Sequence, residues 1–150
     1  MKTVRHLAIA VLALTASAVA LFAKPIPGPK GGRIITTAAP YAEFFVDQDR
    51  FVVVSFYDQD LKPLAPSGQV VTAIVEAKSG KVNLTFAEKN GTLVSTGKLP
   101  QGDDYNVVLQ VKDNAAARPK NYRVLYHDEV CAECKRAEYA CVCEAGAEHE

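Results

Sequence analysis

The chain has 150 residues, which is enough for one domain, and its 17 basic and 17 acidic side chains give no net charge at neutral pH. Nucleic acid and anionic membrane surfaces attract proteins with a dense basic face, which this balance does not provide. We therefore expect no nucleic-acid partner and no polybasic membrane patch.

The N-terminus has the pattern of a secretory signal peptide. Basic residues near Met1 precede an uncharged apolar run over residues 7–22, and small residues such as Ala18, Ala20 and Ala23 close it. The run is short for a membrane span, which needs about 20 apolar residues. We predict that residues 1–23 are a cleaved signal peptide, that the mature protein is periplasmic or secreted, and that no stable membrane span remains after cleavage.

Residues 24–32 are predicted to be an extended linker. Pro25, Pro27 and Pro29 occupy alternate positions, and Gly31-Gly32 ends the segment. Each proline fixes φ and removes a backbone donor, so the stretch should be stiff and solvated.

Residues 33–127 are predicted to form an all-β domain. Short apolar stretches with period-two alternation are separated by turn residues, of which Asn90-Gly91 is the strongest hairpin pattern. We expect an immunoglobulin-like antiparallel β-sandwich of about seven strands, because such stretches recur every 8–12 residues. The candidate strands are 33–36, 42–46, 50–57, 70–77, 82–87, 92–95, 105–112 and 121–127.

One tyrosine supports the sandwich. Tyr105 opens the strand with the cleanest alternation and follows Leu99-Pro100-Gln101-Gly102. This arrangement is typical of a tyrosine corner, in which the hydroxyl bonds to backbone a few residues upstream. The alternative is an ordinary half-buried strand tyrosine.

The segment 56–64, the strands after it and the Leu99–Val111 stretch together resemble small bacterial periplasmic Ig-like domains of the FixH/YtkA-like and CopC-like groups. The likeness covers roughly residues 42–112. It implies an Ig-like fold, an envelope location and a role near copper handling or heavy-metal efflux. The copper-binding members use His and Met, whereas here the only methionine is Met1, so no copper site is carried over.

The remaining segment, residues 128–150, is predicted to be a short cysteine-rich tail, helical or irregular, with its sulfurs outside the sandwich core. It contains all four cysteines of the chain, Cys131, Cys134, Cys141 and Cys143. As thiolates they could hold zinc in a closed tetrahedral site, or copper(I), with His127 and His149 as substitute ligands. As disulfides, in an oxidising compartment, the nested pairs 131–143 and 134–141 would staple a small hairpin. A labile thiol pair is the third alternative.

Helix geometry limits these alternatives. Residues 129–139 have reasonable helix propensity, but a continuous helix would separate Cys134 from Cys141 by about 10 Å. That distance is too long for one ion or one disulfide, so we expect that the chain turns between them or that the helix stops near Tyr139.

The sequence contains none of the common nucleophile or phosphate-binding motifs, and we predict that the protein is not an enzyme. The acid pairs Asp58/Asp60 and Asp103/Asp104 are expected to be solvated turn residues. The predicted function is an exported, non-catalytic binding module that acts as an accessory in transition-metal handling or efflux through its C-terminal cysteines. The alternative is a structural or protein-interaction sandwich with two disulfides in its tail. The corresponding partner is a metal ion or an envelope protein.

Overall fold

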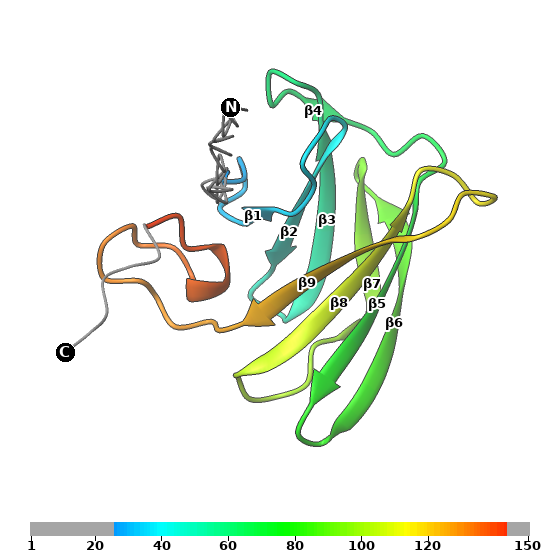
Figure 1. The fold of residues 1–150 in the computed structure, drawn as a ribbon. Coiled ribbons are helices and arrows are strands. Elements are labelled where there is room, and N and C mark those ends of the chain that lie inside the picture. The colour runs from blue at the N-terminus through cyan, green and yellow to red at the C-terminus, as the bar shows by residue number, and fades with distance from the viewer. Residues whose placement is uncertain (1–25, 144–150) are drawn as a thin grey trace, which may run out of the picture.

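The computed structural model describes residues 26–143, and these form an antiparallel all-β protein (Figure 1). The predicted signal peptide and residues 144–150 lie outside the described part. No helix within residues 26–143 is long and apolar enough to cross a membrane. The elements in chain order are β1 (Arg33–Ile34), β2 (Tyr41–Val46), β3 (Phe51–Tyr57), β4 (Pro63–Leu64), β5 (Val70–Ala77), β6 (Gly80–Lys89), β7 (Thr92–Lys98), β8 (Tyr105–Lys112), β9 (Lys120–Tyr126) and the 3₁₀ turn η1 (Glu138–Ala140).

The strand order is β1-β2-β3-β7-β6-β5-β8-β9, with the short β4 paired to β3. One layer therefore places β2, β3 and β7 side by side, and the other places β5, β8 and β9 side by side. These neighbours match strands A, B, E and strands C, F, G of an immunoglobulin sandwich. The predicted immunoglobulin-like β-sandwich is confirmed.

The two layers are joined because β6 belongs to both. Its first part, Gly80 to Thr85, pairs with β5, and its last part, Phe86 to Lys89, pairs with β7. The sequence predicts two stacked sheets, whereas the structure has one curled sheet that folds over itself (Figure 1).

The core is formed by the residues at every second position of the strands, as predicted. β8 alternates strictly between buried and half-buried positions, and its buried residues are Tyr105, Val107, Leu109 and Val111. Inward-facing residues of β2, β3 and β5 complete the core, among them Phe44, Val54 and Val75, all fully buried. Burial of this apolar face is the main force that holds the two layers together.

The predicted turn chemistry is also confirmed. Asn90 and Gly91 have φ values of 52° and 72°, as a type I′ hairpin requires. The Tyr105 hydroxyl donates a hydrogen bond to the Pro100 carbonyl at 3.0 Å, which is the expected tyrosine corner.

A buried carboxylate fixes the segment before β1 to the outer face of β2. Glu43 is fully buried and accepts hydrogen bonds from the backbone N–H groups of Lys30 (3.0 Å) and Gly32 (2.8 Å) and from the Tyr57 hydroxyl (2.6 Å). Gly28 lies so close to the Glu43 carboxylate that no side chain fits there. Hydrogen bonds of this kind offset the cost of burying the charge.

The tail is irregular, which is one of its two predicted forms: residues 129–139 do not form a helix, and the described tail contains only the 3₁₀ turn η1. The prediction that the sulfurs lie outside the core is wrong for Cys131, which is buried. Tyr139 and Ala140 of the tail belong to the buried core cluster. The segment buries a large aromatic side chain against the sandwich, and this tertiary contact overrides its local helix propensity.

Candidate metal centre

The first two cysteines lie on a tight hairpin that follows β9. Val130 and Ala137 form an isolated antiparallel bridge, and the Cys131 N–H donates to the Arg136 carbonyl at 2.8 Å. Lys135 closes the turn with a φ of 59°, which lets its N–H reach the Cys131 carbonyl. The hairpin thus brings Cys131 and Cys134 together.

The other two cysteines follow η1, which reverses the chain. The Ala140 N–H donates to Ala137 and the Cys141 N–H donates to Glu138, at 2.8 and 3.1 Å, so the turn ends at Cys141. The return path places Cys141 and Cys143 against the hairpin. The predicted turn between Cys134 and Cys141 is confirmed.

The four sulfurs form one compact cluster. The Sγ–Sγ distances are 3.7 Å for Cys131–Cys143, 3.7 Å for Cys134–Cys141 and 3.5 Å for Cys131–Cys141, and all four atoms lie within 4.8 Å of one another. Four sulfurs placed about 2.3 Å from a central zinc are about 3.8 Å apart. The four clustered cysteines could therefore bind one metal ion.

Nothing in the described tail has disulfide geometry. All four thiols are free. The sulfur separations are far longer than the bond of about 2.05 Å in a disulfide. Soft thiolate ligands of this kind suit zinc and copper(I), and a tetrahedral arrangement of four sulfurs is the geometry of a structural zinc site.

Backbone N–H groups are directed at one of the sulfurs. Hydrogen bonds from the N–H groups of Val142 and Arg136 lower the pKa of the Cys134 thiol to about 6. Donors of this kind stabilise a thiolate and orient it toward a metal ion.

Two of the other thiols are shifted in the opposite direction. The hydrogen bond between Cys143 and Cys141 raises the pKa of Cys143, and burial raises the pKa of Cys141. Without a cation, four neighbouring sulfurs cannot all ionise, because their negative charges repel one another. A bound divalent ion reverses this effect and deprotonates its thiol ligands.

The loop between the two cysteine pairs is anchored in the sandwich by Tyr139. Its hydroxyl accepts a hydrogen bond from the Val46 N–H at 3.0 Å, and its own N–H donates to the His127 carbonyl at 3.0 Å. The ring meets Phe44 edge-on at 5.4 Å between centroids. Cys134 and Cys141 flank this anchored segment, so the sulfur cluster closes the loop that presents Tyr139.

Tyr139 begins a row of three aromatic rings, which we call the aromatic ladder. Tyr139 stacks on Tyr126 at 5.5 Å, and Tyr126 stacks on Tyr105 at 5.2 Å. The ladder connects the sulfur cluster to the tyrosine corner. The aromatic ladder is not predictable from the sequence alone, because the ring contacts depend on how the tail folds back.

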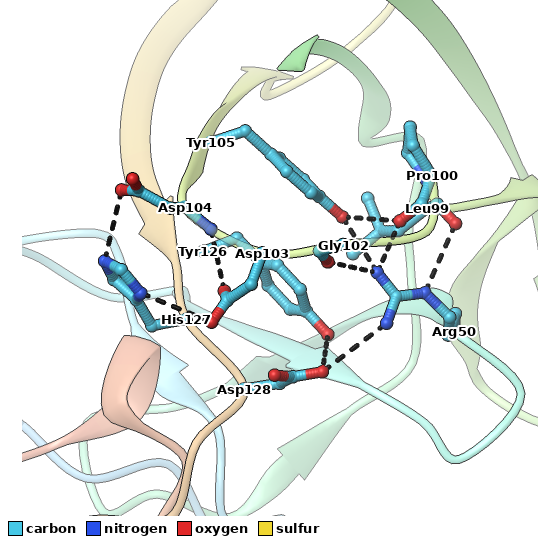
Figure 2. Close-up of polar contacts among 10 residues, drawn as sticks. All are labelled: Arg50, Leu99, Pro100, Gly102, Asp103, Asp104, Tyr105, Tyr126, His127 and Asp128. Atoms are coloured by element: carbon cyan, nitrogen blue, oxygen red, sulfur yellow. Dashed lines mark hydrogen bonds and ion pairs between the residues drawn. The ribbon is translucent and has the colours of Figure 1, made fainter. Parts of the chain in front are cut away.

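Arg50 secures the far end of the ladder. Its guanidinium group donates to the carbonyls of Pro100 and Gly102 and to the Tyr105 hydroxyl, and it pairs with Asp128 at 3.4 Å (Figure 2). It also lies over the Tyr126 ring at 5.5 Å. One side chain thus joins the β2–β3 hairpin, the loop before β8 and the start of the tail.

The histidine predicted as a substitute ligand has other partners. The His127 ring lies between Asp103 and Asp104, at 3.4 Å and 3.5 Å (Figure 2). It is not a member of the cysteine cluster. His149 lies outside the described residues.

Asp58 is a turn residue, as expected. Its carboxylate accepts hydrogen bonds from the backbone N–H groups of Asp60 and Lys62 at 2.9 Å each. The bonds close the turn between β3 and β4.

No family model matches the chain, and searches of curated proteins and of solved structures also find no match. The resemblance to FixH/YtkA-like and CopC-like domains stays a prediction.

Proposed function

We propose that this protein is an exported, non-catalytic metal-binding module that holds one zinc ion in a four-cysteine site. The observation that carries the proposal is the sulfur cluster, whose separations of 3.5–3.7 Å fit tetrahedral thiolate coordination. The signal-peptide pattern of residues 1–23 supports export to the periplasm or beyond it.

The proposed ion has two effects that follow from its position. It neutralises the crowded thiolates, and it ties together the ends of the loop that carries Tyr139. Because an unfolded chain has no such preformed site, zinc-binding free energy adds to folding stability. Cys134, Cys141 and Cys143 are only half-buried, which leaves the ion accessible for exchange with an acceptor. This accessibility supports a role in metal handling.

Metal content after native purification tests the proposal. Full-length protein should carry one zinc per chain, and it should take up cobalt(II) with the visible spectrum of a tetrahedral thiolate site. The double variant Cys131→Ser/Cys134→Ser should carry none. Ser67→Ala, in the loop between β4 and β5, is the matched control and should bind like the native protein. Equal and negligible metal in the native and double-serine proteins would overturn the proposal.

Intact mass separates the proposal from its alternative, an inert tail with two disulfides. The exported protein should show four thiols that alkylate once zinc is removed by a chelator. A mass lower by about two hydrogens per bridge in the freshly isolated protein, with no metal bound, would favour the disulfide form.

A further inference from the structure

The four sulfurs are arranged in two pairs that run across the hairpin. Cys131 and Cys143 are 3.7 Å apart, and so are Cys134 and Cys141. The alternative pairing that uses the 3.5 Å contact between Cys131 and Cys141 leaves Cys134 with Cys143, whose sulfurs lie within 4.8 Å of each other. Of the three sulfur contacts of 3.5–3.7 Å in the described tail, the nested pairing uses two and this alternative uses one.

We propose that oxidation converts the zinc site into these two nested disulfides and releases the ion while the tail stays docked. The inference rests on the proposed function, because it describes how a metal ion bound there is given up. Exported proteins meet oxidising conditions, under which thiolates are converted to disulfides.

The chemistry balances with hydrogen peroxide as the two-electron oxidant. One thiolate attacks the peroxide O–O bond to form a sulfenic acid and hydroxide, and its partner thiolate displaces hydroxide from that sulfur to form the S–S bond. For the whole site, four zinc-bound thiolates, two peroxide molecules and four protons give two disulfides, four waters and one free zinc ion. The Cys134–Cys141 pair should react first, because both its sulfurs are half-buried whereas Cys131 is buried.

The tail is expected to stay in place because each nested bridge replaces a link that the metal supplied. Cys134 and Cys141 flank Tyr139, so their bridge closes the same loop that the ion closed. Closing each pair needs a sulfur displacement of less than about 2 Å, given a disulfide length of about 2.05 Å. Side-chain rotation covers that distance, so the contact of Tyr139 with Val46 is retained.

The experiment is a peroxide titration of zinc-loaded full-length protein. A chromophoric chelator follows the released zinc, and intact mass follows the thiols. We expect one equivalent of zinc to be released and the mass to fall by about four hydrogens relative to the reduced metal-free chain. The backbone amide resonances of Val46 and Tyr139 should keep their positions in the oxidised protein.

Digestion with trypsin identifies which cysteines are bridged. Trypsin cleaves after Lys135 and Arg136, which separates the peptide with Cys131 and Cys134 from the peptide with Cys141 and Cys143. Nested bridges leave the Cys131/Cys134 peptide joined to the Cys141/Cys143 peptide, and fragmentation of the joined peptides identifies each link. In the Cys131→Ser/Cys143→Ser control, the remaining Cys134–Cys141 bridge should form and the Val46 amide should stay in place.

Several results would overturn the inference while leaving the proposed function intact. These are zinc that stays bound at excess peroxide, local bridges that let the two peptides separate, or loss of the Val46 amide resonance on oxidation. A reduced protein that binds no zinc would instead overturn the proposed function, and the inference with it.

Discussion

Substitution of Tyr139 by alanine tests whether the sulfur cluster and the sandwich are energetically coupled. The ring is buried, packs against Phe44 and Tyr126, and its hydroxyl pairs with the Val46 N–H. Removing a buried aromatic side chain costs about 3–5 kcal/mol. We therefore expect Tyr139→Ala to lower the free energy of unfolding of the zinc-loaded protein by about that amount.

The companion variant Tyr139→Phe separates packing from hydrogen bonding. It keeps the ring and leaves the Val46 N–H without its partner, which should cost only about 1 kcal/mol. Both variants are measured by urea denaturation, first with saturating zinc and then with a chelator. Without metal the ends of the loop are no longer tied, so the cost of Tyr139→Ala should fall to below about 1 kcal/mol.

The control variant is Tyr41→Ala, at the opposite end of β2. Its loss of unfolding free energy should be the same with and without metal. A Tyr139→Ala cost that does not change when zinc is removed would refute the coupling between cluster and sandwich. A cost below about 1 kcal/mol in the presence of zinc would refute the docking of the ring itself.

Three further predictions concern the sandwich. Gly28→Ala should lower the free energy of unfolding by about 1–3 kcal/mol, because its Cβ would overlap the Glu43 carboxylate; an unchanged urea midpoint would contradict this. Arg50→Met should cost about 2–3 kcal/mol through lost charge-assisted hydrogen bonds, seen as a lower thermal midpoint, and a native-like midpoint would count against the network. Stability should fall above about pH 10, because burial raises the pKa of several tyrosines in the fold, so the folded state keeps protons that the unfolded state loses; constant urea midpoints between pH 9 and pH 11 would exclude it. Those tyrosines are Tyr57, Tyr105, Tyr126 and Tyr139.

The sandwich was predictable because its information is local. Alternation places the buried face of β8, and Asn90-Gly91 fixes the β6–β7 hairpin through its two positive φ values. Tyr105 identified the crossover before β8 by its position after Leu99-Pro100-Gln101-Gly102. Each of these features depends on residues within a few positions of one another in the chain.

The buried carboxylate, the docked tail and the sulfur cluster depend on contacts between residues that are far apart in the chain. Such contacts cannot be predicted from the pattern of a single sequence. Glu43 alternates onto the outer face of β2, where a solvent-exposed position is expected, yet backbone N–H groups of Lys30 and Gly32 bury it. Tyr139 lies in a segment with helix propensity and is instead drawn into the core. The spacing of the cysteines indicated a site, but that all four sulfurs meet within 4.8 Å of one another could be seen only from their positions in the fold.

The docking of Tyr139 at Val46 spans ninety-three residues of the chain. Under the proposed export, the strand that carries Val46 leaves the membrane before the tail, so the surface that receives Tyr139 can form before the cysteines arrive. Under the proposed zinc site, binding of the ion would then be the last step of maturation, and the cysteines would be open to mispairing until it occurs.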